Sequence, residues 1–173
     1  MEQYLREVYP NYKYISSTTK CLLNQQDIVN DSEKYYMSVL DYRKNRDMEF
    51  LQSLPNPEKF EILINAWCRS DCPYRREHYE DLSRAQLFNT PVYACEYIKE
   101  ENFFTSLGKS HVLTVDEIYN QYVPLGFVNF KIEGRTYHIV DIIETYVYYL
   151  VKPEYKDVVR ADLLKLTKPS GTY

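Results

Sequence analysis

The chain has 173 residues, of which 45% are hydrophobic and 27% charged, and its formal net charge is −4. These values are ordinary for one soluble globular domain, and they argue against a surface that binds polyanions in general. No apolar run reaches the roughly 18 residues of a membrane span, and the amino terminus lacks the apolar core of a signal peptide. We therefore expect one cytoplasmic domain over residues 1–173, with a frayed tail at 167–173.

Two residue counts narrow the fold class and the role of the cysteines. Glycine occurs 4 times against 19 tyrosines, which disfavours an all-β chain of tight hairpins, because such turns rely on glycine. Four cysteines do not suggest a disulfide scaffold in a cytosolic chain, where thiols stay reduced. Metal binding and buried free thiols are the two interpretations that follow.

Helical and extended patterns alternate along the chain. In order, they predict a helix at 2–8, a strand at 12–17, a helix through 21–28, a strand at 35–40, a helix at 47–54 and a strand at 60–65. The second half predicts helices at 73–87 and 114–122, a strand at 127–132, and helices at 139–151 and 154–166. The chain thus contains four βα units.

Capping residues mark two of these helix starts. The hydroxyl run 16–19 is expected to cap the helix through 21–28. Thr114 precedes another helix, and Glu117 stands three residues later, which is the spacing of a capping box. Gly126 then ends that helix.

Four βα units predict parallel strands in the order 1-2-3-4, joined by right-handed crossovers. Four strands are half of a closed (β/α) barrel, so we expect an α/β domain that forms half of a TIM-like barrel, most consistent with a carboxyl-terminal half. Its free strand edges, together with apolar residues expected on an uncovered inner face, predict self-association or pairing with an amino-terminal half barrel. Those residues are Ile62, Ile64, Phe130 and Ile132.

Three cysteines form the sharpest candidate site. Cys68 and Cys72 follow the strand at 60–65 and are separated by three residues, and Cys95 lies on a segment expected to return to the same end. Thiolates of this kind bind zinc or an iron–sulfur cluster. The fourth ligand would be His78, Cys21 or an exogenous group, and buried free thiols are the alternative.

Charged residues at strand ends are the candidate catalytic groups. Asp41 follows the second strand, where a carboxylate can bind a ligand, take a proton or simply shape the turn. Glu133 and Arg135 follow the fourth strand and lie two residues apart, so they point to the same side. They either form structural ion pairs, with each other or with neighbouring strands, or contact a substrate.

The motif FKIEGR at 130–135, with the turn at Gly126 before it and a helix carrying Tyr146, Tyr148 and Tyr149 after it, resembles the end of the barrel in the collagenase-like U-type peptidase family. Members of that family have truncated or distorted TIM barrels. In several, cysteines bind a four-iron four-sulfur cluster, and the activities include oxygen-independent hydroxylation of ubiquinone precursors or RNA bases.

The resemblance implies roles for residues of this chain. Cys68, Cys72 and Cys95 would ligate an iron–sulfur cluster, and the segment 131–135, with Lys131, Glu133 and Arg135, would line or brace the pocket. RNA or a small aromatic molecule would be the substrate. The sequence contains neither a HExxH metal site nor a recognisable Ser/His/Asp arrangement, so it does not indicate a peptidase. The competing hypotheses are a non-catalytic domain with a structural zinc site and a fragment that is inactive on its own.

Overall fold

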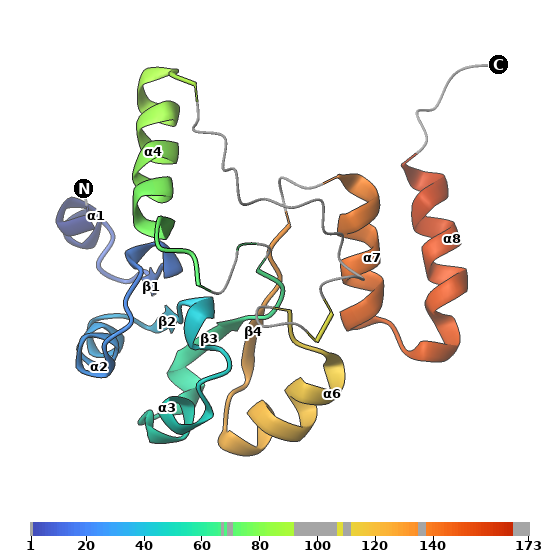
Figure 1. Ribbon diagram of the computed structural model, residues 1–173. Coiled ribbons are helices and arrows are strands. Elements are labelled where there is room, and N and C mark those ends of the chain that lie inside the picture. The colour runs from blue at the N-terminus through green and yellow to red at the C-terminus, as the bar shows by residue number, and fades with distance from the viewer. Residues whose placement is uncertain are drawn as a thin grey trace.

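A four-stranded parallel sheet with the order β1-β2-β3-β4 lies at the centre of the computed structural model (Figure 1). The structure describes residues 2–66, 68, 71–91, 107–108, 112–134 and 138–167. The strands are β1 (Ile15–Ser16), β2 (Met37–Val39), β3 (Phe60–Leu63) and β4 (Asn129–Lys131). All three neighbouring pairs are parallel. The predicted α/β class, with four βα units and sequential parallel strands, is confirmed.

The helices agree with the sequence pattern more closely than the strands do, which are shorter than predicted. They are α1 (Glu2–Val8), α2 (Gln25–Lys34), α3 (Met48–Ser53), α4 (Arg75–Phe88), α6 (Val115–Glu117), α7 (Ile139–Leu150) and α8 (Lys156–Leu166). Short 3₁₀ turns are η1 (Thr18–Lys20), η2 (Tyr42–Lys44), η3 (Pro57–Lys59), η5 (Val123–Leu125) and η6 (Pro153–Tyr155). A π-helical turn, η4 (Ile118–Tyr122), follows α6 directly. The end of the predicted tail, 168–173, lies outside the described residues.

The helix predicted through 21–28 begins later than expected. Asn24 is its cap, since its side chain accepts hydrogen bonds from the backbone N–H groups of Gln26 and Asp27. Ser17 instead caps the single turn η1. Cys21 ends that turn in the left-handed conformation, with φ of 54°, so the helical path is broken before α2.

One face of the sheet is covered by α2, α3 and η4. The core there contains Ile28 of α2, Leu51 of α3 and Tyr122 of η4, packed with residues of β3. Ile62 of β3 and Ile64 just after it belong to this core and are buried. The expectation that these two side chains lie on an uncovered face is therefore wrong, because the strand register turns them toward the helices. Phe130 and Ile132 are only partly buried against the same core.

The opposite face of the sheet carries both apolar and charged side chains. Ile15 of β1 is 52% exposed. Glu61 of β3 faces Lys131 of β4, with 3.7 Å between the carboxylate and the ammonium nitrogen. In a closed barrel this face would line the interior. The half-barrel arrangement and its pairing with a second half stay predictions.

The chain leaves the sheet after β3 and returns to it before α6. Its return is marked by the backbone N–H of Leu113, which donates to the carbonyl of Ile64 at 2.8 Å, and by an antiparallel bridge between Asn65 and Val112. Thus α6 and η4 form the crossover to β4, while α4 belongs to an excursion at the carboxyl ends of the strands. Figure 1 shows α4 standing beyond the sheet, on the side of β1.

Helices α7 and α8 pack against each other beyond β4, on the side of the sheet opposite β1. The Tyr149 hydroxyl of α7 donates to the carbonyls of Ile64 and Leu113, at 3.2 and 2.7 Å, and so fastens α7 to the place where the chain returns. None of the helices in the described part of the chain combines the length and apolar character needed to cross a membrane.

Candidate functional site

The carboxyl ends of the four strands bring polar residues to one edge of the sheet. Thr18 follows β1, Asp41 follows β2, Asn65 follows β3 and Glu133 follows β4. In open α/β sheets, ligands bind at this edge. The structure thus places the predicted residues Asp41 and Glu133 at the expected edge, and the excursion that carries Cys68 and Cys72 starts from it.

Asp41 is the most enclosed charged group of this edge, with 2% of the residue exposed. Its carboxylate accepts from Nε and Nη2 of Arg43, at 2.9 and 3.0 Å, and from Nε of Arg75 at 3.1 Å. The backbone N–H of Arg43 also donates to it at 3.0 Å, which caps η2. Four hydrogen bonds therefore hold one carboxylate between two guanidinium groups.

Arg75, the first residue of α4, is 4% exposed. Its guanidinium lies over the Tyr42 ring, 4.0 Å from the centroid, and 4.8 Å from the centroid of Tyr79. Its Nη2 donates to Oγ1 of Thr18 at 3.2 Å. A buried arginine is stable only with such partners, so Arg75 fixes the start of α4 to the ends of β1 and β2.

The thiols of Cys68 and Cys72 lie within hydrogen-bonding contact, and the Tyr42 hydroxyl contacts Cys68 as well. Cys72 is 5% exposed, and Cys68 packs half-buried against Tyr42, Leu63 and Ala66. Burial raises the pKa of the Cys68 thiol, against the opposing effect of the Tyr42 hydrogen bond and the Arg75 charge. The raised pKa favours the neutral thiol, so a metal ion would have to displace this proton in order to bind.

The other predicted ligands do not join this pair. Among the residues that the structure describes, no group of three or more His, Cys, Asp or Glu side chains is placed to share a metal ion. Cys21 is buried and directs its thiol to the Thr19 carbonyl at 3.5 Å, and His78 lies against Tyr79 on α4. Cys95 lies outside the described residues, so the three-cysteine site stays a prediction.

The end of β4 carries the remaining predicted residues. Glu133 is exposed at the edge, and its backbone bonds to the side chain of Asn65. Lys131 pairs with Glu61 across the sheet. Arg135 lies outside the described residues, so its predicted pairing with Glu133 stays open.

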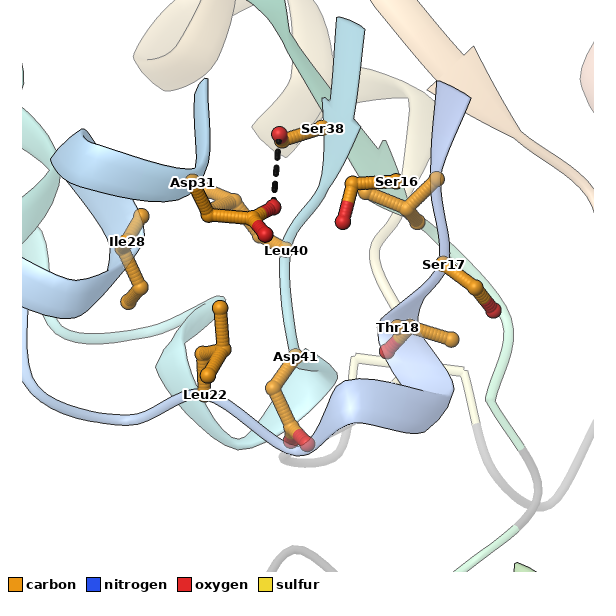
Figure 2. A pocket seen from close by; sticks show the side chains of 10 residues that line it. Ser16, Ser17, Thr18, Leu22, Ile28, Asp31, Ser38, Leu40 and Asp41 are labelled. Carbon is orange, nitrogen blue, oxygen red and sulfur yellow. Dashed lines mark hydrogen bonds between the residues drawn. The ribbon is translucent and has the colours of Figure 1, made fainter. Parts of the chain in front are cut away.

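A small polar cavity of about 10 Å³ lies between β1, β2 and α2 (Figure 2). In Figure 2 Asp31 of α2 points between Ser16 and Ser38, and the Ser38 hydroxyl donates to its carboxylate at 3.1 Å. Although burial opposes it, hydrogen bonds from Lys20, Ser16 and Ser38 hold the pKa of Asp31 below its usual value. The space is about that of one water molecule, so this cavity is too small for a substrate.

Three residues of the edge were not singled out as site residues by the sequence: Tyr42, Asn65 and Arg75. Arg75 sits in a visibly basic stretch, which on sequence alone is typical of a solvated helix face and is also compatible with an anion held beside the strand ends. Its partner Asp41 is 34 residues away, and sequence spacing carries no signal for that contact.

Comparisons with protein-family models, with curated proteins and with solved structures give no match to this chain.

Proposed function

We propose that this chain binds a thiophilic metal centre, an iron–sulfur cluster, through Cys68, Cys72 and Cys95 at the carboxyl edge of the sheet. The observation that carries the proposal is the contact between the Cys68 and Cys72 thiols beside the start of α4. Thiolate ligands are typical of such clusters and of zinc. Cys95 supplies the third thiolate in this proposal.

The residues around the thiols suit a buried, negatively charged centre. Asp41 is shared by Arg43 and Arg75, so this enclosed group of three side chains carries one excess positive charge. That charge lies beside Cys68, where it favours thiolate over thiol. A cluster bound here would supply electrons for the modification of RNA or a small aromatic substrate, with Lys131, Glu133 and Arg135 lining the pocket.

A structural zinc site is the second candidate. It is favoured by the burial of Cys72, because a closed set of protein ligands excludes solvent, whereas a catalytic metal keeps one position open. In that case the metal would hold the excursion after β3 to the sheet, and the chain would catalyse nothing.

The test is metal analysis of protein purified without oxygen. Brown protein that contains iron and sulfide is expected, while colourless protein with zinc would show the structural site. Cys68→Ala, Cys72→Ala and Cys95→Ala should each lose most of the metal, because each removes one ligand. Cys21→Ala is the matched control and should keep it, because its thiol is directed to the Thr19 carbonyl. Full retention by the first three variants would contradict the proposal.

A further inference from the structure

Two consecutive residues after β2, Asp41 and Tyr42, contact the segment that carries the cysteine pair, one at each end of it. Asp41 holds Arg75, which lies three residues beyond Cys72. Tyr42 packs against Cys68, at the other end of the pair. Both ends of the segment that carries the two thiols are therefore held by the same pair of residues after β2.

On the side of Cys72, the contact is a buried ion pair between Asp41 and Arg75. Asp41 and Arg75 are 2% and 4% exposed, and Oδ2 of Asp41 lies 3.1 Å from Nε of Arg75. Breaking a buried pair by removing one partner is costly, because the other charge is left without compensation. Thr18 adds a hydrogen bond to the same guanidinium, so α4 has little freedom to shift its first turn.

On the side of Cys68, the ring of Tyr42 packs against the cysteine and the Tyr42 hydroxyl contacts its thiol. Tyr42 is 1% exposed and forms a small cluster with Leu63 and Ala66, against which Cys68 packs. The guanidinium of Arg75 lies 4.0 Å above the same ring. Tyr42 therefore contacts Cys68 at one end of the segment and Arg75 at the other, so the two sets of contacts are linked through its ring.

We propose that Asp41 and Tyr42 are positioning residues that hold Cys68 and Cys72 together as a preformed thiol pair. For Asp41 this replaces a catalytic role, because its two oxygens are already held by two guanidinium groups and a backbone N–H. The identity of the ligand rests on the proposed function, but the preorganisation of the pair does not. Holding two donors in place before binding removes the ordering cost from the binding step.

The first measurement follows the thiol pair without a metal. In chelated protein, oxidised glutathione converts the two thiols into a Cys68–Cys72 disulfide. Each protein thiol loses one proton and one electron, and the oxidant is reduced to two glutathione thiols. Peptide mass analysis quantifies the product in buffers of defined glutathione ratio. Asp41→Asn should lower the equilibrium constant about 10-fold, and Tyr42→Phe should lower it about 3-fold, because the thiols meet less often.

The second measurement follows metal binding by the absorption of Co²⁺–thiolate charge transfer. The same two variants should bind Co²⁺ about 10-fold and 3-fold more weakly than the unmodified chain. Arg76→Gln is the matched control for both measurements. It removes a neighbouring, exposed guanidinium, which donates to the Lys20 carbonyl at 3.4 Å, so neither quantity should change.

The outcomes separate the two proposals. If Asp41→Asn and Tyr42→Phe lower the disulfide equilibrium constant but the unmodified chain binds no Co²⁺, the positioning role stands and the metal function fails. If it binds Co²⁺ and both variants match the control, the positioning role is overturned. Thermal melting identifies any variant that does not fold. Tyr42→Phe keeps the ring, its packing and the arginine contact, and it removes only the hydroxyl that contacts Cys68. It therefore tests the positioning role of that hydroxyl even if Asp41→Asn unfolds.

Discussion

The side-chain amide of Asn65 makes two hydrogen bonds with the backbone of Glu133. Its Nδ2 donates to the Glu133 carbonyl at 2.7 Å, and its Oδ1 accepts from the Glu133 N–H at 2.7 Å. Asn65 is fully buried, with 0% exposed. The register of β3 and β4 ends with Leu63 and Lys131. Beyond it, the Asn65 side chain takes over the hydrogen bonding between the two segments and holds Glu133 beside the end of β3.

Asn65→Ala should destabilise the protein strongly. The substitution removes both hydrogen bonds of a fully buried side chain and leaves a void in its place, which should cost about 2–4 kcal/mol of unfolding free energy. Urea denaturation measures it. Asn129→Ala is the matched control, because Asn129 donates a single bond, to the Glu58 carbonyl, at an exposed position. A cost for Asn65→Ala no larger than that of Asn129→Ala would show that the bridge is dispensable.

A close approach at Gly126 yields a second prediction. Gly126 has φ of +95°, and a Cβ there would lie 2.7 Å from Cγ of Pro57. Gly126→Ala thus combines backbone strain with a steric clash, and it should cost about 2–5 kcal/mol. Gly108 also has positive φ, +73°, but its Cβ would lie 3.8 Å from Thr114. Gly108→Ala should therefore cost only about 1–2 kcal/mol. Equal melting temperatures for the two variants would refute the clash.

Local signals predicted the fold because they act over a few residues. The capping box of Thr114 and Glu117 is present, with Thr114 Oγ1 accepting from the Glu117 N–H at 3.1 Å. The prediction that the hydroxyl run 16–19 caps α2 was wrong, because Ser17 caps the turn η1 instead. The left-handed conformation of Cys21 separates that turn from the helix. The alternation of Phe60, Ile62 and Ile64 indicates that these side chains share one face of the strand, but it does not show which helices cover that face, so the burial of Ile62 was missed.

The site was less predictable, because its contacts join distant parts of the chain. Asp41 was correctly placed at the end of a strand, yet nothing in its neighbourhood indicates that Arg75 will reach it. The same holds for Asn65, which meets Glu133 across 68 residues. Such residues become visible only when parallel packing brings the strand ends together.

The hydroxyl of Tyr122 should give the protein a measurable sensitivity to alkali. It donates to the Asn45 carbonyl at 2.6 Å, and burial raises its pKa from 10.0 to about 12. Between these two values the unfolded chain loses this proton while the folded chain keeps it, so the stabilising contribution present below pH 10 is lost as the pH rises toward 12. At about 1.4 kcal/mol for each pKa unit, the loss would be on the order of 2–3 kcal/mol.

Tyr122→Phe tests this directly, because it keeps the ring and removes the group that titrates. The variant should be about 1–2 kcal/mol less stable at pH 7, since the Asn45 carbonyl loses its donor. Its stability should then fall less steeply between pH 10 and 12 than that of the unmodified chain, as measured by urea denaturation at each pH. Tyr119→Phe is the control, since Tyr119 belongs to the same turn but is 67% exposed. If the two variants follow the same pH profile, Tyr122 does not cause the alkaline loss.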